Sequence, residues 1–160
     1  MLPQSHFLIG TIVSLFLYYV FPEIGFLNLV IFLLASVLID VDHYLYYVYR
    51  KKNWGPINAT KWFLEKGRIL KNAEQKTRNE FYTGFYFLHG VEVLILLVIL
   101  GYLTSSFFYF ICLGFLLHLI LDYVYQSKTR DRFDKFSIIY DYFKYRKLKF
   151  IDELDGLAKV

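Results

Sequence analysis

Apolar residues gather along the chain into four long runs that short or strongly polar stretches separate. The runs cover residues 6–21, 25–49, 81–103 and 106–125. Each has about 16–25 residues, near the ~20 that a helix needs to cross the hydrocarbon core of a bilayer. The connections between the paired runs, near residues 22–25 and 104–106, are too short for anything except helical hairpins. The pattern predicts an all-α integral membrane protein with four transmembrane helices arranged as two hairpins.

Two polar, basic stretches follow the hairpins. In the loop 50–80, apolar side chains return every three to four residues, which predicts a short amphipathic helix on the membrane surface. After residue 125 the same spacing of Phe133, Phe136, Tyr140 and Phe143 predicts either another interfacial helix or a cap on the bundle. The final acidic turn, residues 152–155, is expected to be a solvated tail. The predicted division is a metal-binding transmembrane domain, 1–126, which includes the loop, and a basic amphipathic segment, 127–160.

Composition and charge agree with a membrane protein and predict its orientation. Hydrophobic residues make up 57% of the 160 positions, too many for a soluble protein of this size to bury. The 18 Lys and Arg residues divide equally between 50–78 and 128–159. The positive-inside rule therefore predicts a multi-pass protein of the inner cell membrane with both termini in the cytoplasm. No nucleic-acid motif accounts for these basic residues, and the single cysteine, Cys112, cannot form an internal disulfide.

Ionisable side chains inside the apolar runs are the candidate chemistry. Each costs about 2.5–3.5 kcal/mol on insertion scales and so marks a functional site by default. With the predicted topology, every histidine and most of these carboxylates fall in the cytoplasmic half of the helices. We expect one layer made of His6, Asp40, Asp42, His43, His89, Glu92, His118 and Asp122.

The spacing within this layer favours a metal site. Asp40 and His43, His89 and Glu92, and His118 and Asp122 are three or four residues apart, which places imidazole and carboxylate on one helix face. Helix bundles use such pairs to bind metal ions. The layer predicts a divalent metal site, with zinc as the expected metal and one or two ions. Asp42 lies on another face unless the helix is distorted, and Asp42 and Glu92 both remain candidates for additional ligand or general base. A metal-free proton relay is the alternative.

At these residues the chain resembles the predicted membrane-bound metal-dependent hydrolases of bacteria and archaea, including the LexA-regulated inner-membrane group. The resemblance covers roughly residues 1–126. It rests on a histidine before the first helix (His6), a D-x-D-H at the end of the second (residues 40–43), His89, and an H-x-x-x-D (His118 and Asp122). Ile39 stands where family members commonly have proline. The sequence 88–92 lacks the arginine and second histidine of the family motif, and Glu92 is the candidate replacement.

The resemblance and the layer together predict a metal-dependent hydrolase with its site at the cytoplasmic leaflet, acting on a membrane lipid or phosphoester. The order of ligands is also loosely similar to that of zinc-dependent phospholipases C and nucleases. Arg50, Lys51 and Lys52 are expected near an anionic head group. The alternatives are a metal or proton transport protein and a scaffold with a structural metal. Small residues, Gly84, Gly90 and Gly114, are compatible with homo-oligomers.

Overall fold

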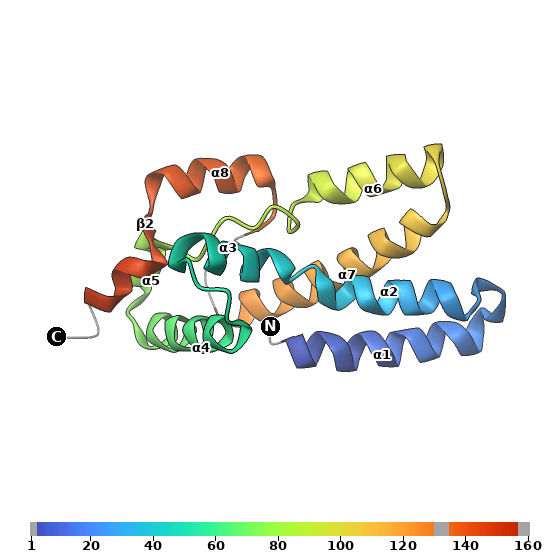
Figure 1. Cartoon of the computed structure of the whole chain (residues 1–160), viewed down its shortest axis with the longest axis horizontal. Helices are drawn as coiled ribbons and strands as arrows, with labels where there is room; N and C mark the ends of the chain where they lie inside the picture. The colour runs from blue at the N-terminus through green and yellow to red at the C-terminus, as the bar shows by residue number, and fades with distance from the viewer. Residues whose placement is uncertain (1–2, 130–134, 157–160) are drawn as a thin grey trace.

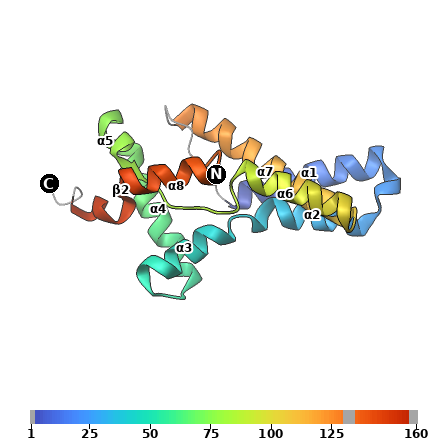
Figure 2. The ribbon, with the colours of Figure 1, turned by 90° about the horizontal axis from the view of Figure 1, so that it is seen from above.

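The computed structural model describes residues 3–129 and 135–156, and its helices gather in two regions along the long axis (Figure 1). One region, here called the bundle, contains α1 (Pro3–Val20), α2 (Phe26–Leu38), α6 (Val91–Leu103) and α7 (Phe107–Thr129), with the short η1 (Pro22–Ile24) joining α1 to α2. The other, here called the polar end, contains α3 (Val41–Lys51), α4 (Pro56–Asn72), α5 (Gln75–Glu80), β1 (Phe81–Tyr82), α8 (Ile138–Lys147), β2 (Lys149–Phe150) and η2 (Ile151–Gly156). The view from above shows the same division (Figure 2). The predicted all-α class is confirmed.

The bundle packs closely inside and presents apolar side chains outward. α7 packs against α2, α1 and α6. A Cβ at Gly114 would lie 2.5 Å from the carbonyl oxygen of Phe32, so glycine here permits the close approach of α7 to α2. On the outer surface, Leu15, Leu96 and Tyr102 are exposed. Such an apolar surface is typical of helices that face lipid.

Two helices are long and apolar enough to cross a membrane. They are Phe26–Lys51, which comprises α2 and α3, and Phe107–Lys128 in α7. α6 is apolar, but it has only 13 residues, about 20 Å at 1.5 Å per residue. That all four predicted helices cross the membrane therefore stays a prediction.

The second and third apolar runs are less regular than their hydrophobicity suggests. A turn at Ile39 and Asp40 separates α2 from α3. In the third run only Val91–Leu103 is an α-helix, because residues 81–90 form the short β1 and then an irregular loop. Gly84 has a φ of +147° there, a conformation that glycine adopts easily. The predicted helix over 81–103 is wrong for its first ten residues, and His89, which was expected to share a helix face with Glu92, lies in a turn before α6.

The C-terminal segment closes the polar end. β2 pairs in parallel with β1, and Phe81 faces Lys149 in that register. A core cluster joins residues from α3, α4 and β1 to residues from η2. It contains Tyr46, Leu70, Phe81, Tyr86, Ile151 and Leu154. Leu154 is fully buried, so the expectation of a solvated tail is wrong for this residue. Phe133, part of the predicted amphipathic repeat, lies outside the described residues.

Candidate metal centre

Six of the eight predicted site residues form two adjoining groups where the bundle meets the polar end. His6, His118 and Asp122 form the first, here called the bundle triad, and Asp40, His43 and His89 form the second, here called the polar-end triad. Within each triad one ligand atom per residue lies within 4.8 Å of the others. Asp40 joins them, because its Oδ1 is 3.5 Å from Nε2 of both His89 and His118. The structure therefore brings six residues of the predicted layer together. Of the other two, Asp42 contacts His43 and His89, and Glu92 belongs to neither triad.

The bundle triad is almost completely buried between α1 and α7. Nε2 of His6 lies 3.3 Å from Oδ1 of Asp122, and Nε2 of His118 lies 3.8 Å from Oδ2. The rings of His6 and His118 stack with centroids 3.8 Å apart. The predicted spacing of four residues between His118 and Asp122 thus places both side chains in one site.

The break between α2 and α3 fixes the orientation of His118. The backbone N–H of Asp40 bonds to the carbonyl of Val37 rather than to Ser36, the residue four positions earlier that a regular helix would use. The carbonyl oxygen of Ser36 instead lies 2.9 Å from Nδ1 of His118. Since a carbonyl can only accept, Nδ1 carries the proton, and the lone pair of Nε2 points toward Asp40 and Asp122.

Asp42 orients the two histidines of the polar-end triad. Its Oδ2 lies 2.9 Å from Nδ1 of His89 and accepts the N–H of Leu88, while its Oδ1 lies 3.0 Å from Nδ1 of His43. His89 therefore turns Nε2 toward Asp40, 3.5 Å away, as metal-binding histidines do when a carboxylate holds the other nitrogen. In His43, Nδ1 lies 3.2 Å from Oδ1 of Asp40 as well, and Nε2 faces away from both carboxylates. The helix break resolves the expected misalignment of Asp42, which lies behind the histidines rather than beside Asp40.

The donor set fits a divalent cation. Nε2 of His6, His89 and His118 is buried and makes no hydrogen bond of regular geometry among the described residues, while a carboxylate oxygen lies 3.3–3.5 Å from each. Leaving a buried polar atom unsatisfied costs about 1–3 kcal/mol each. Imidazole nitrogens together with carboxylate oxygens are the ligands that zinc and related divalent metals prefer.

Glu92 is not brought to the triads. Its carboxylate accepts hydrogen bonds from the hydroxyl of Ser137 at 2.5 Å and from the backbone N–H of Ile138 at 3.0 Å. Ser137 is the N-cap of α8 and also accepts from the N–H of Tyr140. Glu92 therefore ties the start of α6 to the start of α8.

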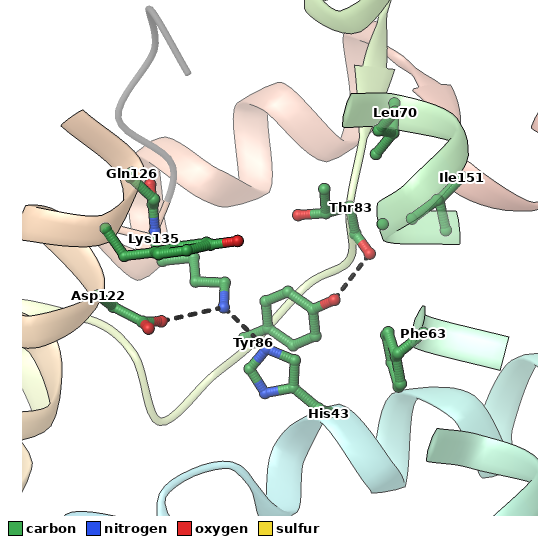
Figure 3. A pocket seen from close by; sticks show the side chains of 11 residues that line it. His43, Phe63, Leu70, Thr83, Tyr86, Asp122, Gln126, Lys135 and Ile151 are labelled. Atoms are coloured by element: carbon green, nitrogen blue, oxygen red, sulfur yellow. Dashed lines mark hydrogen bonds and ion pairs between the residues drawn. The ribbon is translucent and has the colours of Figure 1, made fainter. Parts of the chain in front are cut away.

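Lys135 is a site residue that the sequence interpretation missed. Its Nζ lies 2.7 Å from Nε2 of His43 and 3.6 Å from Oδ2 of Asp122, and 4.5 Å from the ring centroid of Tyr86 (Figure 3). In the sequence it is one of the nine basic residues of 128–159, which the charge pattern assigned to topology, and no local spacing distinguishes it from the others.

A cavity of about 810 Å³ leads to both triads. Asp40, His43, Asp122 and Lys135 line it on one side. The wall from α4 and α5 is both apolar and basic, and it includes Phe63, Leu64, Leu70, Arg68, Lys71 and Arg78. Arg50 and Lys51, which were expected near an anionic head group, pair with Asp152 instead. Their side-chain nitrogens lie 2.6 and 3.8 Å from its carboxylate.

Comparisons with protein families, with characterised proteins and with solved structures give no match for this chain. The resemblance noted in the sequence therefore stays a prediction, and function has to be inferred from the geometry of the site.

Proposed function

We propose that this protein is a membrane-embedded, metal-dependent hydrolase acting on a phosphate-bearing lipid at the cytoplasmic leaflet. One observation carries the proposal: buried histidine nitrogens meet two carboxylates, Asp40 and Asp122, which line a large cavity whose wall is partly apolar and partly basic. Nε2 of His6, His89 and His118 makes no hydrogen bond of regular geometry among the described residues, and each lies 3.3–3.5 Å from a carboxylate oxygen, so a cation bound there would contact both kinds of ligand.

The triads supply the ligands for the metal. His6, His89 and His118 contribute Nε2, and Asp40 and Asp122 contribute oxygens. A divalent cation bound there supplies Lewis acidity, which activates water and polarises the scissile group. Asp42 holds the tautomers of His43 and His89, and the carbonyl of Ser36 does the same for His118. Because Glu92 bonds to α8, the proposal assigns it a structural role in place of base or ligand.

The cavity supports the choice of substrate. Phe63 and Leu64 offer apolar surface to an acyl chain, while Arg68 and Lys71 offer charge to a phosphate. The cavity also includes Pro3, at the first turn of α1. In the four-helix topology proposed here, that turn lies at the membrane surface on the cytoplasmic side, where a lipid head group is found.

The first test is the metal content of the detergent-purified protein, measured by elemental mass spectrometry. The second is an assay of lipid hydrolysis in vesicles that contain phosphatidic acid or phosphatidylglycerol. His118→Ala should lose the metal and the activity. Asn28→Ala, which removes a side chain bonded to the carbonyl of Ile24 at the far end of α2, is the control. Metal-free wild-type protein that stays folded after incubation with zinc would contradict the proposal. Metal-dependent flux across liposomes without hydrolysis would favour transport instead.

A further inference from the structure

Lys135 reaches the triads from the C-terminal segment, which contributes none of the triad residues. The ammonium group donates to Nε2 of His43 at 2.7 Å. Nδ1 of that ring lies 3.0 Å from the carboxylate of Asp42, so the lone pair that His43 can offer a metal is the one that faces Lys135. The second contact of the ammonium, at 3.6 Å, is Oδ2 of Asp122 in the other triad. A positive charge therefore already lies between the triads (Figure 3).

The backbone around Lys135 is held in an uncommon conformation. Lys135 has a φ of +67°, in the left-handed region that residues other than glycine rarely adopt. Its carbonyl accepts from the hydroxyl of Tyr123 at 3.1 Å, and its N–H donates to Oδ1 of Asp141 at 3.3 Å. Asp141 is 1% exposed. Such a conformation persists only where the surroundings enforce it, and it is concentrated at functional sites.

The residues just after Lys135 are fixed to the bundle. The N–H of Val91 donates to the carbonyl of Phe136 at 3.0 Å, and Glu92 accepts from Ser137 and Ile138. These bonds connect the first turn of α6 to the three residues that follow the lysine. Glu92 thus connects the start of α6 to the segment that follows Lys135, which gives a structural reason for a carboxylate at the start of an otherwise apolar helix.

We propose that the ammonium group of Lys135 takes the place of a second metal ion. The protein then binds one divalent ion, and the ammonium occupies the position at His43 that a second ion would need. The ligands of the single ion are His6, His89, His118, Asp40 and Asp122. One lone pair on Nε2 of His43 cannot bind both a metal and an N–H donor. Repulsion between the ammonium and a second divalent ion adds to this exclusion. Lys135 also lines the cavity, so an anionic oxygen of the substrate would lie between the bound metal and the lysine.

This inference rests on the proposed metal site, but it does not need an assay of hydrolysis. Purified protein is stripped with chelator, reloaded with zinc and freed of excess, and zinc per chain is measured by elemental mass spectrometry. Wild type and Lys135→Arg should bind one equivalent, and Lys135→Met should bind two. Lys149→Met, which removes an exposed lysine from the same C-terminal segment, should bind one.

A second variant tests the inference without altering Lys135. His43→Ala should keep its single zinc, whereas His118→Ala should lose it. The inference is overturned if wild type binds two equivalents, if Lys135→Met binds no more than wild type, or if His43→Ala loses the ion. The proposed function fails on a different result, namely that wild type and His118→Ala both contain no metal. In that case there is no bound metal ion beside which Lys135 could replace a second one. Thermal unfolding of each variant shows that the proteins compared are folded.

Discussion

The bundle and the polar end are stabilised in different ways. In the bundle, α1, α2, α6 and α7 pack through apolar and small side chains, and their outer faces are apolar as well. At the polar end, α3 and the C-terminal segment are joined by an ion pair between Arg50 and Asp152 and by a cluster rich in aromatic side chains. The two triads lie where these regions meet. Charged side chains are tolerated there, next to the apolar bundle, because the polar end supplies hydrogen-bonding partners.

The sharpest way to break this junction is to remove Asp42. Asp42→Ala leaves the N–H of Leu88 and Nδ1 of His89 without their acceptor. At about 2 kcal/mol per buried unsatisfied donor, we expect a loss of about 4 kcal/mol in the free energy of unfolding. Metal affinity should fall about 10–100-fold, as is typical when a carboxylate behind a histidine ligand is lost.

Chemical denaturation in detergent and zinc titration measure these two effects of Asp42→Ala. Asp42→Asn, which keeps one acceptor oxygen, should fall between the alanine variant and wild type. An alanine variant with unchanged metal affinity would show that Asp42 does not orient the histidines.

A matched pair of arginine substitutions compares the outer surface of the bundle with that of the polar end. Leu96 in α6 and Ile139 in α8 are 54% and 64% exposed. If α6 crosses the membrane, Leu96→Arg should cost about 2.5–3.5 kcal/mol of insertion free energy and reduce the amount of protein in the membrane fraction. Ile139→Arg, at the polar end, should have little effect. Equal membrane yields for both variants would argue against a transmembrane α6.

The smallest effect is expected at the surface of the polar end. Lys149 hydrogen-bonds to Glu80 at 2.9 Å and lowers the pKa of this carboxylate below its ordinary value of 4.5. A carboxylate whose pKa is lowered by folding adds stability above its unfolded pKa and loses it as the pH falls through the folded pKa. Both side chains are well exposed, so Glu80→Gln should lower the melting temperature only slightly at pH 7 and not at all near pH 3. A larger difference at the lower pH would contradict this sign.

Local sequence patterns predicted much of the bundle and of the site. Hydrophobic run length located α1 and α7, since each of these two runs is one continuous helix, and it located α2 as the first half of the second run. Spacing by three or four residues correctly paired Asp40 with His43 and His118 with Asp122. These predictions succeed because both residues of each pair share a local backbone segment whose geometry the spacing fixes.

Other features depend on contacts between distant segments, which local spacing does not contain. The loop before α6 looks apolar enough to be helical, but its N–H at Leu88 bonds to Asp42, 46 positions away. Glu92 shares the predicted spacing with His89, yet it bonds to Ser137. Lys135 is 92 positions from His43. In each case tertiary hydrogen bonds override what periodicity within one helix suggests.

The interruption at Ile39 and Asp40 also has a mechanical meaning. His6, His118 and Asp122 belong to the bundle, whereas His43 follows the break on α3 and His89 is held by Asp42 from that same helix. Asp40 lies at the break itself, 3.5 Å from Nε2 of both His89 and His118, so a bend there would change its contacts with both triads. A ligand that contacts both triads would therefore resist bending at this break and hold the two regions in one relative orientation.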